Sequence, residues 1–193
     1  MTPGIEDIRK FYDSWVDYLA VERSRHRMVY GHLDRFVRPG SSVLDIGCGT
    51  GFTSRHLASN KCRVVAVDLS PQLIDCARSR NNGYNIEYVV ADITRWDDPR
   101  KFDYIVMVDV AEHILPESVG DLMSVLNRVS HSNTVLLLHI PKKISNSVQP
   151  VDVQWSMGDV ESAFGRAGFV PILFDGRVVD YALYIMTRRE RTV

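Results

Sequence analysis

Short apolar runs rich in β-branched residues alternate with helical spans along most of this chain. The candidate strands are residues 42–46, 63–67, 86–90, 104–108 and 134–140, and the helical spans between them cover about 53–60, 71–80 and 116–129. Most of these runs are apolar throughout, which is typical of strands buried on both faces of a parallel sheet. We therefore expect an α/β fold of repeated strand–helix–strand units, with a doubly wound, mostly parallel sheet.

The carboxyl end departs from this alternation. Ser156 and Asp159 have the spacing of a capping box and predict a helix that closes at Gly168. Residues 169–174 and 178–186 then read as two strands joined by an Asp-Gly-Arg turn, a tight hairpin signal. The sheet should therefore have seven strands, with an antiparallel strand from this C-terminal hairpin.

The amino end is predicted to be helical. Apolar residues recur at three- and four-residue steps from Ile5 to Leu19, which is the stripe of an amphipathic helix. A second helical stretch in a strongly charged background follows and ends at the Arg-Pro-Gly sequence that begins at residue 38. We expect a single-domain fold in which a helical segment, residues 1–36, precedes the sheet-forming residues 37–193.

Composition limits the partners and the compartment. The chain has 193 residues, with 23 Lys and Arg against 24 Asp and Glu, which suits one globular domain and gives no strong electrostatic field. Neither nucleic acid nor an anionic membrane is therefore expected as a partner. The sequence lacks an apolar run of ~20 residues and a secretory signal, so we expect a cytoplasmic protein. Cys48, Cys62 and Cys76 are too widely spaced for a disulfide framework or a zinc site.

Three glycines directly follow the first predicted strand and precede a helix. Residues 43–52 read Val-Leu-Asp-Ile-Gly-Cys-Gly-Thr-Gly-Phe. Without Cβ atoms the backbone can turn sharply, and a ligand can lie against it near the helix amino terminus, as in nucleotide cradles. A dinucleotide fingerprint would need glycine where Phe52 stands, and the Gly-Lys-Ser/Thr of a phosphate-binding loop is missing. The pattern is instead Gly-x-Gly-x-Gly, with the acid Asp45 two residues before Gly47.

Acidic residues lie at the ends of the second and third predicted strands. A carboxylate at Asp68 can accept both ribose hydroxyls of an adenosine. Asp92 could accept from the adenine amino group while Ile93 packs on the ring. Structural alternatives stay open, because Asp68 could cap the helix that begins at Pro71 and Asp92 could be a turn acid near Thr94.

Taken together, the glycine loop, Asp68, Asp92 and the Glu112-His113 turn resemble the class I S-adenosylmethionine-dependent methyltransferases. The resemblance covers about residues 37–187, with residues 102–113 as the family's fourth strand and following turn. It implies S-adenosyl-L-methionine as cofactor and S-adenosyl-L-homocysteine as product. The implied cofactor-binding residues are Asp45, Gly47, Cys48, Gly49 and Gly51 for the aminoacyl end, Asp68 and Leu69 for the ribose, Asp92 and Ile93 for the adenine, together with Val108 and Tyr12.

Polar side chains near the ends of the fourth and fifth strands are candidates for catalysis. Displacement from a sulfonium needs no acid, so in-line orientation in a dry pocket can supply most of the rate. A hydroxyl acceptor would gain from a base. The catalytic candidates are His113, His139 and Glu112, with Asp109 as a further possible base. In the family the position of His113 usually packs beneath the methionine part of the cofactor, and His139 could equally be a satisfied buried histidine.

Asp109, Glu112 and His113 also form an acid-x-x-Glu-His sequence. It is similar to the one that holds magnesium in small-RNA terminal 2′-O-methyltransferases and in some quinone-ring O-methyltransferases. Magnesium on such ligands could bridge vicinal hydroxyls and favour an alkoxide. This sequence departs from the RNA enzymes, because its first acid is Asp rather than Glu and residues 151–155 contain no further His. We therefore expect no bound metal, and these three residues are the candidate ligands if one binds.

The amino-terminal helix is a candidate lid. In similar enzymes such a helix folds over the cofactor, and aromatic side chains such as Tyr12 would be attracted to the sulfonium charge. The helix could equally pack its apolar stripe on the sheet. A basic cluster follows it and could bind an anionic acceptor or form a solvated face: Arg23, Arg25, His26 and Arg27.

Two absent motifs narrow the reaction. The sequence lacks the Asn/Asp-Pro-Pro-Tyr/Phe signature of adenine-N6 methylation and the Pro-Cys pair of covalent pyrimidine-C5 methylation. We expect methyl transfer to oxygen or nitrogen of a small-molecule acceptor, in a site that a second copy of the chain or a partner subunit could complete. The alternatives are a magnesium-assisted RNA 2′-O-methyltransferase and a noncatalytic cofactor-binding subunit of a methyltransferase complex. An NAD-dependent oxidoreductase is more distant, because Phe52 breaks its fingerprint.

Overall fold

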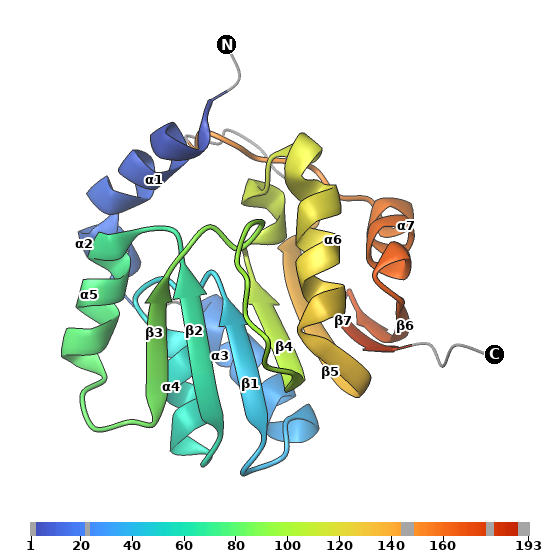
Figure 1. Cartoon of the computed structure of the whole chain (residues 1–193), viewed down its shortest axis with the longest axis horizontal. Helices are drawn as coiled ribbons and strands as arrows, with labels where there is room; N and C mark the ends of the chain where they lie inside the picture. The colour runs from blue at the N-terminus through green and yellow to red at the C-terminus, as the bar shows by residue number, and fades with distance from the viewer. Residues whose placement is uncertain (1–2, 22–23, 144–148, 177–179, 189–193) are drawn as a thin grey trace. The chain divides into compact units, whose positions relative to one another are not determined.

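The computed structural model describes residues 3–21, 24–143, 149–176 and 180–188. They fall into two compact units that divide between Asp92 and Ile93, with three of the seven strands in the first unit and four in the second (Figure 1). The α/β fold class predicted from the alternating pattern is thereby confirmed. Within the described ranges, none of the helices combines the length and the apolar character that crossing a membrane requires.

The first unit contains three parallel strands in the order β3-β2-β1. Their bounds are β1 Ser42–Ile46, β2 Arg63–Asp68 and β3 Ile86–Val90. The register sets Ile46 opposite Val67, so β1 and β2 end side by side. Both strands are largely buried, as predicted, whereas Val90 on β3 is 44% exposed. β3 lies at the end of the strand order and is covered less completely, and its sequence is interrupted by Glu87 rather than apolar throughout.

Helices flank these strands at the positions that the pattern predicts. They are α3 (Ser24–Phe36), α4 (Phe52–Ser59) and α5 (Pro71–Arg80). α4 contacts β2, and α5 contacts β3. The start of α5 follows from its sequence, since the Ser70 hydroxyl accepts the Leu73 N–H and Pro71 occupies the first helical turn, where its missing N–H costs nothing.

The predicted amino-terminal helix is divided into two. α1 covers Ile5–Ser14 and α2 covers Val16–Leu19, and both contact α5. The break lies at Trp15, whose backbone leaves the helical region and whose N–H donates to the Tyr12 carbonyl, three residues back. The apolar stripe from Ile5 to Leu19 is therefore presented by two short helices rather than by one.

The second unit contains four strands in the order β4-β5-β7-β6. β4 and β5 are parallel, and β7 runs antiparallel to β5 and to β6. The antiparallel C-terminal strand is thus confirmed, while Arg177 of the predicted turn and the first two residues of the predicted strand 178–186 lie outside the described residues. The bounds are β4 Phe102–Val108, β5 Ser130–Pro141, β6 Phe169–Asp175 and β7 Tyr181–Arg188.

The helices of the second unit follow the predicted capping and turn signals, with one difference. Ser156 and Asp159 form the expected capping box at the start of α7 (Met157–Arg166), and Gly168 follows with a left-handed φ of 81°. The span predicted as one helix from residue 116 to 129 is instead the short turn η2 (Pro116–Ser118) followed by α6 (Val119–Arg128). A further turn, η1 (Ala111–His113), follows β4.

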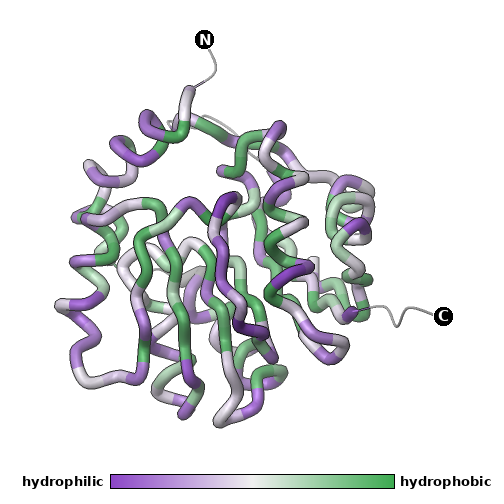
Figure 2. Tube along the Cα trace, in the orientation of Figure 1, coloured by the Kyte–Doolittle hydropathy of each residue, from purple (hydrophilic) through white to green (hydrophobic). Residues whose placement is uncertain are grey.

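Apolar side chains of the strands and of the inward helix faces form the core of each unit. Figure 2 shows apolar residues along the strands and polar residues concentrated in turns and loops. Leu44 and Ile74 are fully buried in the first unit, and Ile105, Leu126 and Phe164 in the second. These rigid cores hold the loops at the carboxyl ends of the strands, where open α/β sheets bind their ligands.

Candidate functional site

The glycine loop between β1 and α4 has the backbone that its sequence predicts. Gly47, Gly49 and Gly51 have φ angles of 67°, 53° and 81°, all in the left-handed region that side chains with a Cβ rarely adopt. The N–H groups of Gly47 and Cys48 both donate to the Val67 carbonyl, at 2.8 and 3.1 Å. The loop is therefore fastened to the end of β2.

Asp68 is held at the end of β2 by two backbone amides. Its Oδ2 accepts the Gly49 N–H at 2.8 Å, and its Oδ1 accepts the Ser70 N–H at 2.9 Å. The predicted glycine and ribose residues are thus brought together. Burial raises the pKa of Asp68, although both amide contacts oppose the shift. The cap of α5 is Ser70 rather than Asp68, so the alternative assignment of Asp68 as that cap is corrected.

Asp45 lies at the base of the loop and is 1% exposed. Its Oδ2 accepts the Ser54 hydroxyl of α4 at 2.5 Å. Burial raises the pKa of Asp45 to about 7, against the opposing effect of the Ser54 hydrogen bond, and the nearby Asp68 raises it further. The carboxyl group is therefore in reach of titration near neutral pH.

We expect this pKa to make the free energy of unfolding depend on pH. Between about pH 4 and pH 7 the folded protein binds more protons at Asp45 than the unfolded chain does, so its stability falls as pH rises through that window. The slope from one such group is at most about 1.4 kcal/mol per pH unit. Urea unfolding of the wild type and of Asp45→Asn across this window should show a flatter pH dependence in the variant. Parallel curves would contradict the assignment.

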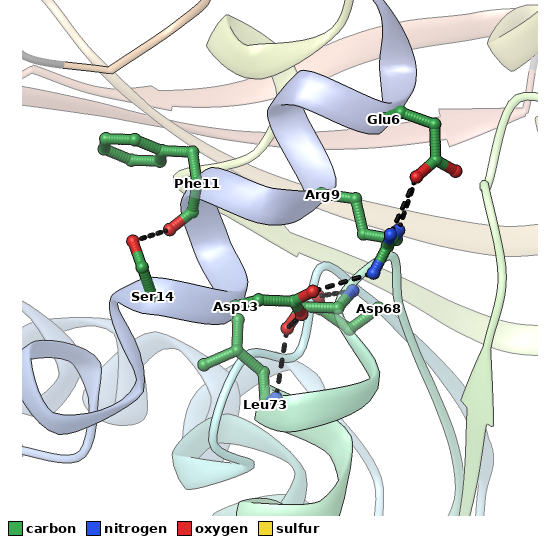
Figure 3. Close-up of polar contacts among 8 residues, drawn as sticks. Glu6, Arg9, Phe11, Asp13, Ser14, Asp68 and Leu73 are labelled. Carbon is green, nitrogen blue, oxygen red and sulfur yellow. Dashed lines mark hydrogen bonds and ion pairs between the residues drawn. The ribbon is translucent and has the colours of Figure 1, made fainter.

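The start of α5 also ties α1 to Asp68. The Asp13 carboxylate accepts the Ser70 hydroxyl at 2.5 Å and the Arg9 guanidinium at 2.8 Å. Figure 3 shows Arg9 between Glu6 and Asp13, with Asp13 directed from α1 toward Asp68 and the first turn of α5. Asp13 was not predicted as a site residue, because the only local signal in the sequence is the Ser70-Pro71 helix start.

Tyr12 lies in an aromatic cluster on α1 and α2. Its ring packs edge-on against Phe11 at 5.3 Å, Phe11 lies 4.5 Å from Trp15, and Trp15 lies 4.7 Å from Tyr18. The end of α2 also reaches the glycine loop, because the Thr50 hydroxyl donates to the Leu19 carbonyl at 2.9 Å. The lid role of these helices stays a prediction.

The remaining cofactor candidates lie at strand ends or in the loop. Cys48 is buried, and this burial raises its thiol pKa well above the ordinary value. Leu69 follows Asp68 and is half-buried. Asp92 is half-buried after β3, whereas Ile93 is buried and Val108 half-buried in the second unit.

Asp109 and His139 are paired in the second unit. Asp109 directly follows β4, and His139 lies on β5 in register with Val108. The His139 Nδ1 lies 2.6 Å from the Asp109 Oδ1, and the Asp109 N–H donates to the His139 carbonyl at 3.0 Å. The His139 ring stacks on Tyr181 at 4.8 Å. Asp109 and His139 were predicted as separate candidates. Their pairing was not predicted, because they are 30 residues apart and only the pairing of β4 with β5 brings them together.

Glu112 and His113 hold the segment after β5. The His113 Nδ1 lies 2.9 Å from the Val151 carbonyl and 3.2 Å from the Asp152 carboxylate, while its Nε2 lies 3.7 Å from Glu112. The Val153 N–H donates to the Glu112 carbonyl at 2.7 Å. Burial raises the pKa of Asp152, and the His113 charge opposes this shift. These contacts give His113 a role in positioning the segment 151–153.

The candidate metal ligands do not form a cluster. In the parts of the chain that the structure describes, no group of three or more His, Cys, Asp or Glu side chains is arranged to hold a metal ion. Asp109 pairs with His139, whereas His113 faces Asp152. Of the predicted basic cluster, Arg23 and the Arg25 side chain lie outside the described residues. His26 packs 5.5 Å from Phe52, and Arg27 is exposed.

The sequence of this chain is similar to the sequences of known methyltransferases. Residues 43–133 match a family model described as a methyltransferase domain. Magnesium-protoporphyrin O-methyltransferase of Rhodobacter capsulatus is 38% identical over 101 residues, which are 50% of this chain and 44% of that protein. Ubiquinone biosynthesis O-methyltransferase of Xanthomonas campestris pv. campestris is 28% identical over 131 residues, which are 64% of this chain and 54% of that protein. The chain thus matches about half the length of these relatives.

The fold is also similar to that of solved structures. The structure of DhpI in complex with S-adenosylhomocysteine superposes with a TM-score of 0.79 at 18% sequence identity, and the match covers 97% of this chain and 98% of that one. At this identity the likeness establishes the shared fold. The matched family segment begins inside β1 and includes the glycine loop and Asp68.

Proposed function

Since this chain belongs to the class I S-adenosylmethionine-dependent methyltransferase family, we propose that it transfers a methyl group from S-adenosylmethionine to oxygen or nitrogen of a cytoplasmic small-molecule acceptor. The reaction is an in-line displacement that leaves S-adenosylhomocysteine. The names of the two curated relatives support an acceptor of this kind, because both are O-methyltransferases of small molecules.

One observation supports the proposal most strongly: the Gly49 and Ser70 backbone N–H groups each donate a hydrogen bond to the Asp68 carboxylate. Each carboxylate oxygen has two lone-pair sites, and each amide occupies one of them. The remaining sites can accept the two hydroxyls of a ribose. Because the amides fix both oxygens, the carboxylate is oriented before any ligand arrives, which lowers the entropic cost of binding.

The rest of the loop suits the aminoacyl end of the cofactor. Gly49 has nothing within 4 Å of the position that a Cβ would take, so the backbone there is open to close approach. Asp45 would face a cationic amino group only in its ionised form, and such a charge would lower the raised pKa of this carboxyl.

When bound, the cofactor supplies the activated methyl group, and the chain supplies orientation. We propose that Asp68, Leu69, Asp92 and Ile93 hold the nucleoside. The aminoacyl end would be held by Asp45, Gly47, Cys48, Gly49 and Gly51, and Val108 and Tyr12 would be further contacts of the cofactor. Residues 1–36 would act as the lid ahead of the domain formed by residues 37–193. Orientation of this kind supplies several kcal/mol of barrier lowering without a covalent intermediate.

The test is transfer of tritium from labelled S-adenosylmethionine by the purified chain into a small-molecule extract and, separately, into short RNA, each with magnesium and with a chelator. Label in the small-molecule fraction that survives chelation is the expected result. Magnesium-dependent label in RNA would instead identify an RNA 2′-O-methyltransferase. Binding of S-adenosylhomocysteine with no label in either fraction would identify a noncatalytic cofactor-binding subunit.

A further inference from the structure

We propose that His139 is the general base of the transfer, that Asp109 positions it, and that the acceptor is therefore a phenol or alcohol rather than a carboxylate or an amine. This inference deepens the proposed function and rests on it. It is carried by the geometry of the pair after β4 and on β5, with Tyr181 of β7 against the ring.

The pair is built from both backbone and side-chain contacts. The Asp109 N–H donates to the His139 carbonyl, and the Asp109 carboxylate lies 2.6 Å from the His139 Nδ1. The backbone contact fixes the distance between β5 and the residue that follows β4. The side-chain contact fixes the orientation of the His139 ring. A carboxylate accepts but cannot donate when ionised, so Nδ1 must carry the proton. The neutral ring is thereby held in the tautomer whose Nε2 has a free lone pair.

The backbone at Asp109 is unusual and supports a functional role. Its φ of 54° is in the left-handed region, which few residues other than Gly adopt, although Asp and Asn tolerate it better than most. An extended residue would continue β4, whereas this conformation turns the carboxylate back to His139. Such a conformation persists at sites where the geometry serves a purpose.

Nε2 of His139 is available for chemistry. The residue is 3% exposed, and in the described part of the chain no hydrogen bond to Nε2 is formed. Nε2 is not among the fully buried side-chain atoms that lack a partner in the described residues, so this nitrogen keeps some access to solvent or ligand although the residue as a whole is buried. Stacking on Tyr181 at an interplanar angle of 17° restricts rotation of the ring, so Nε2 keeps one direction.

A general base is useful only for acceptors that must lose a proton before they attack the methyl group. A carboxylate is already ionised at neutral pH, and a neutral amine attacks through its own lone pair, so neither depends on a base for the displacement. A phenol or alcohol holds its proton at neutral pH and is a poor nucleophile until the proton leaves. General base catalysis of this step contributes about 10² to 10⁴-fold.

The step balances without a further reactant. The acceptor O–H bond breaks, and its proton passes to the lone pair of His139 Nε2. The oxygen forms a bond to the methyl carbon as the carbon–sulfur bond breaks, and that electron pair goes to sulfur, which becomes a neutral thioether. The Asp109 carboxylate stabilises the resulting imidazolium, which later returns its proton to solvent.

The first experiment measures the tautomer directly by ¹⁵N NMR of the histidine-labelled protein, with the His139 signals assigned by their loss in His139→Gln. We expect the neutral ring of the wild type to carry its proton on Nδ1 rather than on Nε2. In Asp109→Gly, where glycine tolerates the left-handed backbone, the ring should shift toward the Nε2-protonated form. An Nε2-protonated ring in the wild type, or no change in Asp109→Gly, would overturn the role of Asp109.

The second experiment measures tritium transfer from labelled S-adenosylmethionine to phenol, catechol, 4-nitrophenol, benzoate and a primary amine. We expect label in the phenols and a loss of about 10² to 10⁴-fold in kcat for His139→Gln, largest for phenol and smallest for the more acidic 4-nitrophenol. S-adenosylhomocysteine affinity should be unchanged. His131→Gln is the matched control, since His131 lies 3.3 Å from Asp103 in a partly exposed pair on the same two strands.

The outcomes separate this inference from the proposed function. Label only in benzoate or the amine, label in the phenols that His139→Gln leaves unchanged, or no labelled phenol at all would each overturn the base assignment. In the first two cases the protein remains a methyltransferase. The proposed function itself fails only if the extract experiment described above also shows no transfer.

Discussion

Asp68→Ala should weaken S-adenosylhomocysteine binding by about 100-fold or more. Two hydrogen bonds from ribose hydroxyls to a charged acceptor are worth roughly 1.5–3 kcal/mol each, and a loss of 1.4 kcal/mol is tenfold in affinity. The substitution also leaves the Gly49 and Ser70 amides without their acceptor, so the loop and the start of α5 lose their common anchor. Isothermal calorimetry of the purified variants measures the effect.

Asp75→Ala is the matched control for this prediction. Asp75 is a carboxylate on α5 whose side chain is 74% exposed and lies 3.3 Å from Arg78. An exposed pair of this kind contributes little, so affinity for S-adenosylhomocysteine should stay within about twofold of the wild type. Equal binding by Asp68→Ala and the wild type would refute the assignment of Asp68 to the ribose.

Gly51→Ala should destabilise the fold by about 2–5 kcal/mol, from a left-handed backbone penalty of roughly 1–2 kcal/mol and an overpacking cost of roughly 1–3 kcal/mol. A Cβ at Gly51 would lie 2.5 Å from the Asn81 Nδ2 and 2.6 Å from the Tyr88 hydroxyl. These two groups are hydrogen-bonded to each other at 2.8 Å, so neither can withdraw without breaking that contact. The midpoint of urea unfolding reports the change.

Gly83→Ala separates the two causes. Gly83 also has a positive φ, 95°, but nothing lies within 4 Å of the position of its missing Cβ. It should therefore show the backbone penalty alone, at about 1–2 kcal/mol. If both variants lose the same stability, the contact of Gly51 with Asn81 and Tyr88 is not the cause of the effect.

The first half of the candidate site was largely predictable because its signals are local. Glycines at three alternate positions after a buried strand indicated a backbone that other residues rarely adopt, and the φ angles of Gly47, Gly49 and Gly51 bear this out. Asp68 followed from the strand pattern, because the end of an apolar run fixes the place of the next polar residue. The roles assigned to these residues toward the cofactor remain proposals.

The side-chain contacts of the candidate residues in the second unit could not be predicted from the sequence. Asp109, Glu112 and His113 form a sequence similar to a magnesium site, yet Asp109 pairs with His139 and His113 with the segment at Val151. Spacing alone cannot decide between these arrangements. The turn η1 and the left-handed backbone at Asp109 set the directions of the side chains, and no periodic pattern encodes either one.

The sequence by itself determined the fold class, the order of its elements, the glycine loop and the acids at the strand ends. These features depend on hydrophobic periodicity and on the conformational limits of single residues, which neighbouring residues express directly. The tertiary structure alone decided that Ser70 and Gly49 grip Asp68, that Asp13 joins them, and that Asp109 orients His139. Contacts between residues far apart in the chain depend on strand register and on loop backbone, which are settled only when the packed elements fix them together.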